Sequence, residues 1–196
     1  MLNPNFVIIG VIAQFFGGLS YLIDTIKGKI RPNRVSWFLW GLAAFIAFTE
    51  ELKQGVGIQS LTTFMVGFVP LCVFIASFFN KKSEWKLETF DFLCGILSIL
   101  GLLFWYITKI GNIVIFFSIL ADTFATLPTI MKSYHHPETE NDLPYSMGIV
   151  NGGIALLTLQ IWNFQYYGYP LYLVIANSII VLFVRFKLGK ILSKKI

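Results

Sequence analysis

The sequence predicts an all-α membrane protein with seven transmembrane helices, and three observations lead to this fold class. First, 56% of the 196 residues are hydrophobic, only 13% are charged, and the mean hydropathy is +0.73, whereas a soluble domain carries about a quarter charged residues. Second, stretches without a charged residue recur along the chain at the length of a membrane-spanning helix, about 20 residues. Third, lysine and arginine are concentrated in alternate connections. This composition excludes a disordered chain, and two cysteines are too few for a disulfide scaffold.

The first five apolar stretches each have roughly the length of one helix. In chain order they are Phe6–Ile23, Val35–Thr49, Gln54–Asn80, Phe92–Thr108 and Ile110–Met131, of which only the last contains a charged residue. The residues before the first stretch include no basic side chain, and no small-residue cleavage site follows it. We therefore expect the first stretch to be a span and not a signal peptide.

The sixth stretch, Leu143–Val184, has 42 residues without a charge, which is twice the length of one span. Its middle, Asn163–Pro170, contains turn residues and a cluster of aromatic side chains. Aromatic residues are enriched where helices meet the membrane interface, and Asn, Gly and Pro mark turns. We expect the chain to turn there, which divides the stretch into two helices and gives seven spans.

The distribution of basic residues predicts the orientation. With the N-terminus outside, thirteen of the fifteen Lys and Arg residues fall on the inner side, and only Lys53 and Lys109 fall outside. The positive-inside rule then places the N-terminus out and the C-terminus in. The net charge of +5 needs no nucleic acid to explain it, because the anionic lipid of an inner leaflet is a sufficient counterpart. We expect a multi-pass protein of a bacterial plasma membrane.

The two halves of the chain show a weak duplication. Pro70–Ser77 and Pro170–Asn177 share four of eight residues at an offset of 100, and further identities occur at an offset of 108. The second offset pairs Gln14 with Asp122 and Trp37 with Tyr145. Two three-helix copies can share one orientation only if an odd number of spans separates them, and the fourth span meets this condition. Chance identity among apolar residues is the alternative.

The predicted order of three helices, one linker helix and three helices resembles the SWEET and PQ-loop superfamily. Local similarity lies in Leu127-Pro128-Thr129 near the inner end of the fifth helix and in Asn151-Gly152-Gly153 of the sixth. The Pro-Gln pair of the family is degenerate here, because Thr129 replaces Gln and Ser20-Tyr21 stands in the first copy. The resemblance implies repeats at 1–82 and 110–188, a linker helix at 83–109 and a basic tail at 189–196.

Asp122 is the most informative side chain, since it lies near the middle of its span. A carboxylate at that depth costs at least about 2.5–3.5 kcal/mol and normally faces a cavity or a partner. A site that binds and releases a proton is one interpretation, and a structural hydrogen-bond anchor is the other. Gln14, Asn151 and Asn177 lie at a similar depth, so we expect the four to line a pocket for a small polar solute.

Aromatic and proline residues complete the predicted site. Trp37 and Trp40 could stack on a ring-shaped solute, or they could face lipid near an interface. Pro70, Pro128 and Pro170 interrupt helical hydrogen bonding, which suits either hinges or static kinks. His135, His136, Glu138 and Glu140 lie in a polar loop that we expect to be solvated, with no metal bound.

These features predict a small-solute transporter that works by alternating access, on a sugar or another small polar metabolite, with proton coupling through Asp122. No catalytic motif is present in the sequence, so we expect neither an enzyme nor a cofactor. A non-transporting receptor and a lipid-handling protein of the same fold are the alternatives. Assembly into a homo-oligomer is left open by the sequence.

Overall fold

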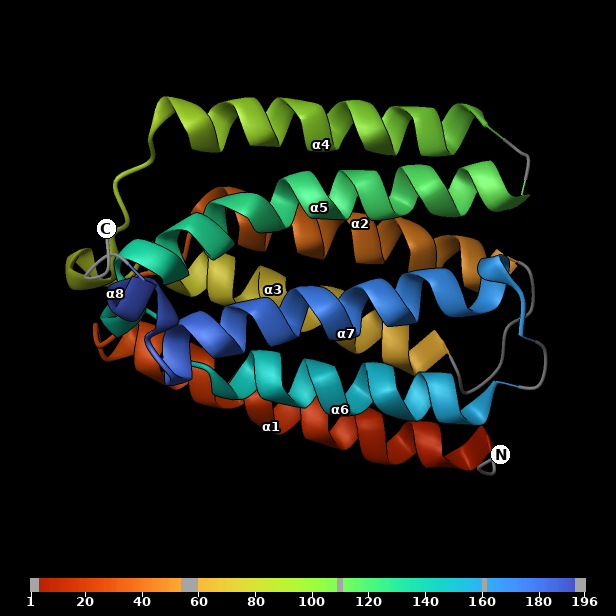
Figure 1. Ribbon diagram of the computed structural model, residues 1–196, viewed down its shortest axis with the longest axis horizontal. Coiled ribbons are helices and arrows are strands. Elements are labelled where there is room, and N and C mark those ends of the chain that lie inside the picture. Colours follow the sequence, from red (N-terminus) through yellow and green to blue (C-terminus); the bar gives the residue numbers. More distant parts are fainter. Residues whose placement is uncertain (1–3, 54–59, 109–110, 160–161, 193–196) are drawn as a thin grey trace.

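The computed structural model describes residues 4–53, 60–108, 111–159 and 162–192, and over these residues the chain is helical, without a strand (Figure 1). This confirms the all-α class. The α-helices are α1 (Val7–Ile26), α2 (Arg34–Lys53), α3 (Ser60–Ala76), α4 (Thr89–Ile107), α5 (Gly111–His135), α6 (Leu143–Thr158), α7 (Phe164–Arg185) and the short α8 (Leu188–Leu192). Three 3₁₀ turns lie at Pro4–Phe6, Lys81–Ser83 and Pro137–Thr139.

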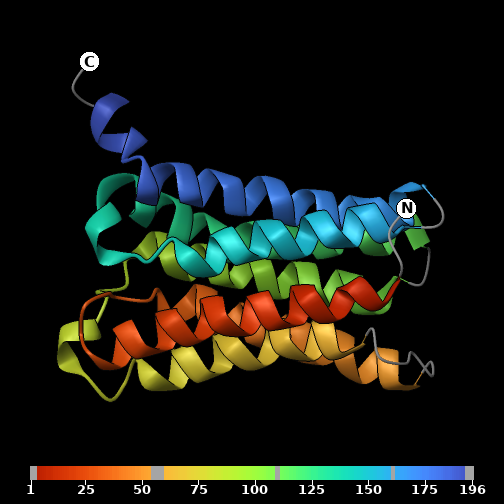
Figure 2. The same ribbon diagram turned by 90° about the horizontal axis from the view of Figure 1, so that it is seen from below.

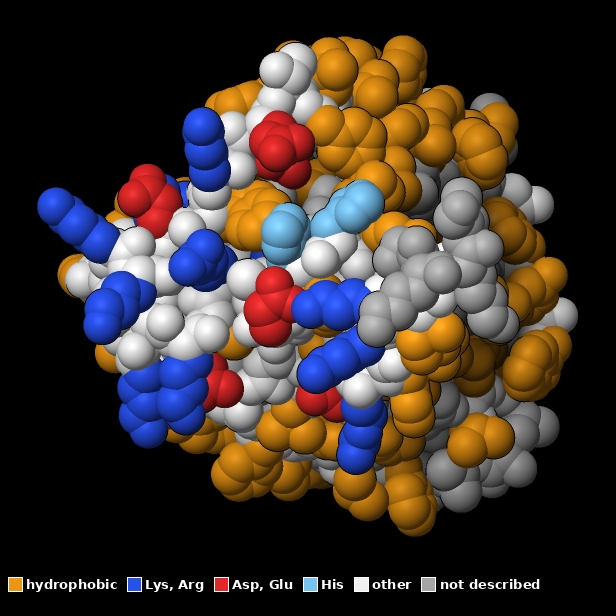
Figure 3. Space-filling model, turned by 60° about the vertical axis from the view of Figure 1, so that its left-hand side comes forward, with side chains coloured by type: hydrophobic (Ala, Val, Ile, Leu, Met, Phe, Trp, Pro, Cys, Tyr) orange, Lys and Arg blue, Asp and Glu red, His pale blue; other side chains and the backbone are white. Residues whose placement is uncertain are grey.

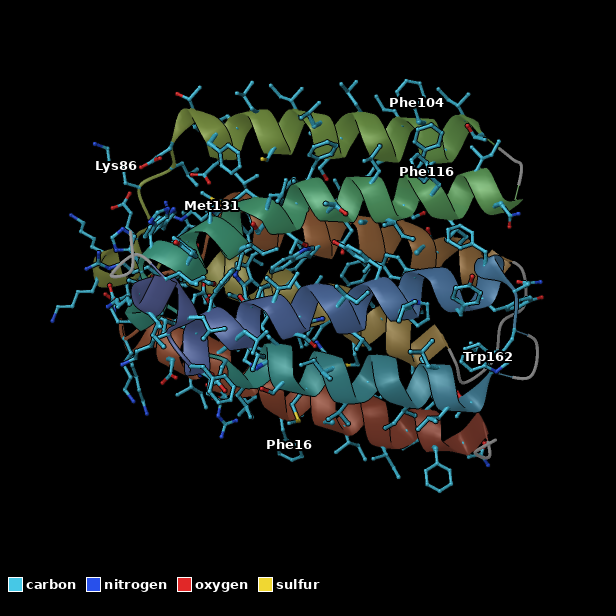
Figure 4. The ribbon with its side chains drawn as sticks, viewed as in Figure 1. Phe16, Lys86, Phe104, Phe116, Met131 and Trp162 are labelled. Carbon is cyan, nitrogen blue, oxygen red and sulfur yellow. The ribbon has the colours of Figure 1, made fainter. Side chains whose placement is uncertain are left out.

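Four of these helices are long and apolar enough to cross a membrane: Val7–Ile26, Thr89–Ile107, Ile115–His135 and Tyr166–Arg185. The apolar parts of α2, α3 and α6 are shorter, at Arg34–Thr49, Thr63–Ala76 and Leu143–Thr158. Large apolar side chains also cover the outside of the bundle, such as Phe16, which points away from the neighbouring helices in Figure 4. A long apolar helix with an exposed apolar outer face is typical of a helical membrane protein.

The break between the last two long helices lies earlier than predicted. The chain leaves α6 at Leu159, and α7 begins at Phe164, so the aromatic segment up to Pro170 is helical and not a turn. Asn163 has an extended backbone, and its carbonyl accepts hydrogen bonds from the backbone N–H groups of Tyr166 and Tyr167. Pro170 can lie inside the helix because a proline removes only one backbone hydrogen bond, which neighbouring helices compensate in a membrane protein.

Six of the helices form a closed ring. Helix α1 packs against α3 and α6, α2 packs against α3 and α5, and α7 packs against α5 and α6. The order around the ring is therefore α1, α3, α2, α5, α7, α6. Helix α4 lies outside it, mainly against α5 (Figures 1 and 2). We refer to α1–α3 as the first three-helix unit and to α5–α7 as the second.

Glycines allow the closest helix contacts. A Cβ atom on Gly18 of α1 would lie 2.2 Å from a methyl group of Val69 on α3, and one on Gly101 of α4 would lie within 3.1 Å of both side-chain and backbone atoms of Ala121 on α5. Cys94 is buried on α4 and Cys72 is half-buried on α3, and both are free thiols.

Successive helices run in opposite directions, so the two ends of the bundle collect different connections. One end holds the connections 27–33, 77–88 and 136–142 together with the segment 185–192. All described Lys and Arg residues except Lys53 lie at this end, which we call the basic end (Figure 3). In Figure 4, Lys86 marks the basic end and Trp162 marks the opposite end.

Candidate functional site

A stripe of polar side chains runs along one face of α5, toward the inside of the ring. Asp122, Thr126, Thr129 and Ser133 follow the spacing i, i+4, i+7 and i+11, which places them on one side of a helix. Thr126, Thr129 and Ser133 are buried, and Asp122 is half-buried. Within apolar helices, polar groups are costly and are normally turned toward partners or a pathway.

The N-terminal part of this stripe, Asp122 and Thr126, forms a cluster with Trp40 and Tyr172. We call these four residues the Asp122 cluster. The indole Nε1 of Trp40, on α2, donates a hydrogen bond of 3.1 Å to Thr126 Oγ1. The hydroxyl of Tyr172, on α7, lies 3.4 Å from the same oxygen and also close to the Asp122 carboxyl. Among the described residues no Lys or Arg forms an ion pair with Asp122. The cluster therefore joins α2 of the first unit to α5 and α7 of the second.

Both tryptophans on α2 face the interior and not lipid. Trp37 is buried, with its ring centroid 4.3 Å from that of Tyr21 on α1. Trp40 meets Trp37 edge to face at 5.3 Å and approaches Tyr145 on α6 at 6.5 Å. Aromatic rings from three helices thus pack between the two units, and Trp40 connects them to the Asp122 cluster.

The three predicted amide side chains lie elsewhere. Asn151 of α6 has its amide against Gly10 of α1, where a Cβ atom would lie 2.4 Å from Asn151 Oδ1. Asn177 of α7 donates to the carbonyl of Leu173 on its own helix and lies against Gly148 of α6. The buried Oε1 of Gln14 has no hydrogen-bond partner among the described residues. Within that part of the chain no hydrogen bond connects Gln14, Asn151 or Asn177 with Asp122.

The three predicted hinge prolines all lie inside helices: Pro70 in α3, Pro128 in α5 and Pro170 in α7. Pro70 and Pro128 are buried, and Pro128 directly precedes the buried Thr129 of the polar stripe. The carbonyl of Pro170 lies beside Gly152 of α6. Two of the three prolines are therefore buried, and the third lies at the contact of α7 with α6.

A second polar cluster, which the sequence did not reveal, closes the basic end of the ring. Lys132 Nζ lies 2.5 Å from Glu140 Oε1, and the two side chains are 1% and 0% exposed. Glu140 Oε2 accepts hydrogen bonds from the hydroxyls of Tyr21 at 2.7 Å and Tyr145 at 3.1 Å. We call these four residues the Glu140 cluster. The expectation of a solvated polar loop is wrong for Glu140, because the turn at Pro137–Thr139 directs its side chain into the bundle.

The Glu140 cluster joins the two three-helix units. Lys132, Glu140 and Tyr145 belong to the second unit, so the buried ion pair and one of its hydrogen bonds are internal to that unit. The first unit contributes the Tyr21 hydroxyl to Glu140 and the carbonyl of Arg31, which accepts a hydrogen bond from Lys132 Nζ. The backbone N–H of Arg31 also donates to the carbonyl of Thr139 at 2.9 Å. A buried charge pair is favourable only with such additional hydrogen bonds. The first unit supplies two of them, from the Tyr21 hydroxyl and to the Arg31 carbonyl.

Further polar atoms are buried inside the bundle. Thr129 Oγ1 and Ser133 Oγ on α5 and Ser36 Oγ on α2 are buried without a hydrogen-bond partner in the described protein. Buried hydroxyl groups in native proteins normally bond to water or to a ligand when no protein group is available. The polar stripe of α5 therefore has unused hydrogen-bonding capacity at Thr129, between Asp122 and Lys132, and at Ser133, directly after Lys132.

No group of three or more His, Cys, Asp or Glu residues with the geometry of a metal site occurs in the part of the chain that the structure describes. Comparison with protein-family models, curated proteins and solved structures finds no match to this chain. The function must therefore be inferred from the two polar clusters and from the arrangement of the helices around them.

Proposed function

We propose that this chain is a seven-span membrane transporter that moves a small polar solute, such as a sugar, between its two three-helix units by alternating access. The observation that carries this proposal is the buried polar stripe of α5, which begins at the Asp122 cluster and ends at the Glu140 cluster. A structural hydrogen-bond anchor would need only one hydrogen-bonded polar side chain. A row of polar side chains along the helix axis, between two units, is expected of a solute pathway.

The packing order of the ring supports two related units. Exchanging α1, α2 and α3 with α5, α6 and α7 converts the contact between α1 and α6 into the contact between α5 and α2, and both contacts are present. The internal contacts of the two units correspond in the same way. This arrangement is similar to that of SWEET and PQ-loop proteins, in which parallel repeats are related by an axis along the membrane normal.

The distribution of charge supports an orientation. Seven spans place the two termini on opposite sides of a membrane, and the basic end contains the C-terminal segment 185–192. By the positive-inside rule, the basic end faces the cytoplasm and the N-terminus lies outside. The Glu140 cluster then closes the cytoplasmic side of the pathway in this conformation.

Opening of that side would separate the two units. The hydrogen bond from Tyr21 to Glu140 and the bond from Lys132 to the Arg31 carbonyl cross between the units and would break. The Lys132–Glu140 ion pair lies within the second unit and would remain intact. The closed state is thus held by hydrogen bonds to charged groups, which are stronger than those between neutral groups and still reversible.

Uptake into proteoliposomes tests the proposal, with a panel of sugars, amino acids and vitamins as solutes. We expect uptake of one solute class that depends on pH, and we expect Asp122→Asn to fold normally but to lose that dependence. Asp122→Ala should also weaken solute binding, because it removes the hydrogen-bonding group. Asp142→Asn is the matched control, since Asp142 lies outside the polar stripe of α5 and pairs with the exposed Arg185 at 3.6 Å.

Three results would contradict parts of the proposal. If Asp122→Asn keeps the wild-type rate and pH profile, Asp122 is a structural anchor and not the proton site. A solute that stabilises the purified protein without any flux would favour a receptor of the same fold. Transfer of phospholipid between vesicles, without solute uptake, would favour a lipid-handling protein.

A further inference from the structure

The connection between α3 and α4 forms a surface cavity at the basic end, on the outside of the bundle from the Glu140 cluster, which Arg31 contacts through its backbone. The cavity has a volume of about 480 Å³ and is lined by Arg31, Lys81, Lys82, Glu84 and Lys86. Four of the five lining residues are cationic, and all five are exposed. Arg31 comes from the connection between α1 and α2, so two separate segments of the first unit and its linker form the walls.

Hydrogen bonds fix these walls relative to each other. Asn80 Nδ2 donates to the carbonyl of Ile26 at 2.8 Å, and the hydroxyl of Ser83 donates to the carbonyl of Thr25. Gly28 has a φ of +71°, and a Cβ atom on it would lie 2.8 Å from the Asn80 amide and 2.9 Å from Lys82 Cβ. Glycine is therefore required where the two connections meet, both for its conformation and for the close approach.

The cations of the cavity have no acidic partner within the described residues. The one acid in the lining, Glu84, lies 3.7 Å from Arg34, which also binds the hydroxyl and the carbonyl of Ser77. Neither Arg31 nor any of the three lysines forms an ion pair in that part of the chain. Like charges held in one concave site repel each other, and an anion with several acceptor oxygens would relieve this repulsion.

The surroundings of the cavity distinguish a lipid from a soluble anion. Phe78 and Phe79 directly precede the cavity segment and are 58% and 79% exposed, and the Phe78 ring lies 4.2 Å from the Arg34 guanidinium. Exposed phenylalanine beside lysine and arginine is the pattern that binds a membrane surface, with rings among the acyl chains and cations at the phosphates. Binding of a soluble anion does not require exposed phenylalanine rings beside the site.

We propose that this cavity binds the phosphate headgroup of an anionic phospholipid of the leaflet at the basic end. Arg31, Lys81, Lys82 and Lys86 contact the phosphate, and Phe78 and Phe79 contact the acyl chains. The site fixes the linker helix and the first three-helix unit to the membrane surface. This inference requires a membrane setting but not transport, so it stands or falls separately from the proposed function.

Binding of defined lipids to the purified full-length protein tests the site, by native mass spectrometry in detergent. We expect phosphatidylglycerol to bind at least tenfold more tightly than phosphatidylcholine. A triple variant with Lys81→Ala, Lys82→Ala and Lys86→Ala should lose most of this preference. The matched control removes the same charge at the same end, with Arg185→Ala, Lys187→Ala and Lys190→Ala, and should keep the affinity within about twofold. The thermal unfolding of both variants shows whether each is folded.

Two outcomes would overturn the inference. Equal loss in the two triple variants would mean that net charge attracts the lipid and that the cavity is not a site. Soluble glycerol phosphate that competes with phosphatidylglycerol at equal concentration would mean that the cavity binds a free anion and not a lipid. The lipid measurement involves no solute uptake, so an inactive transporter does not affect its result.

Discussion

Replacing Tyr21 with phenylalanine removes one hydroxyl group from the contact between the two three-helix units. The ring stays, and with it the packing against Trp37 at a centroid distance of 4.3 Å. What is lost is the hydrogen bond of 2.7 Å from Tyr21 to Glu140 Oε2, which crosses between the units. The Lys132–Glu140 pair keeps its own contact, so the change acts on the contact between the units, which the proposed cycle opens, and not on the fold of either unit.

The size of the effect follows from the kind of bond that is lost. A hydrogen bond to a charged group contributes about 1.5–3 kcal/mol, and about 1.4 kcal/mol corresponds to a tenfold change in an equilibrium constant. We therefore expect Tyr21→Phe to shift the balance toward the state open at the basic end by about tenfold to a hundredfold. Tyr145→Phe is the matched control, because its 3.1 Å bond to the same carboxylate lies within the second unit.

Pulsed electron paramagnetic resonance can measure this shift through the distance between two spin labels. The labels would be attached at Lys27→Cys and His135→Cys, which are exposed residues at the basic end of the two units, in a background with Cys72→Ala and Cys94→Ala. We expect a longer distance to become populated in Tyr21→Phe and not in Tyr145→Phe. If the two variants show the same distance distribution, the Tyr21 hydroxyl does not hold the units together.

Two further predictions concern packing and pH. Gly101→Ala should lower the thermal stability of the purified protein, because the added Cβ would lie within 3.1 Å of the backbone of Ala121 as well as its side chain. Gly153→Ala, with no atom within 4 Å of the added Cβ, is its control and should be neutral or slightly stabilising; equal effects would contradict the close contact of α4 with α5. At the surface, the hydrogen bond from Lys190 lowers the pKa of Glu138 below its ordinary value of 4.5. The contact between α8 and the Pro137–Thr139 turn should therefore persist above pH 4.5 and weaken as the pH falls through the lowered pKa, so a spin label at Leu192 should become more mobile in acid. Glu138→Gln should remove this pH dependence, and a label whose mobility never changes with pH would disprove the contact.

Much of the fold could be predicted because its signals are local. The length of an apolar stretch and the absence of charge identify a helix without any knowledge of its neighbours. The boundary at Asn163–Pro170 is misplaced, because Gly and Pro predict a turn in a segment that is helical from Phe164 onward. In apolar surroundings a helix tolerates these residues, since the alternative is unsatisfied backbone.

The site could be predicted only in part, because its contacts join distant residues. The depth of Asp122 in its span makes it a candidate from sequence alone, but its neighbour Tyr172 and the bond from Trp40 to Thr126 depend on how three helices pack. Glu140 was missed for the same reason. A glutamate in a polar loop, three residues after Pro137, gives no sign of burial, and its partner Tyr21 lies 119 residues away.

A reversible cross-link at the basic end tests the central claim that solute passes between the two units. Arg31 and Thr139 belong to different units, and their backbones are hydrogen-bonded at 2.9 Å, so cysteines at both positions lie close enough for a disulfide. With the two native cysteines replaced by alanine, we expect uptake of the transported solute into proteoliposomes to stop on oxidation and to return on reduction. Uptake at the same rate in the oxidised and the reduced protein would show that the pathway does not open between the units.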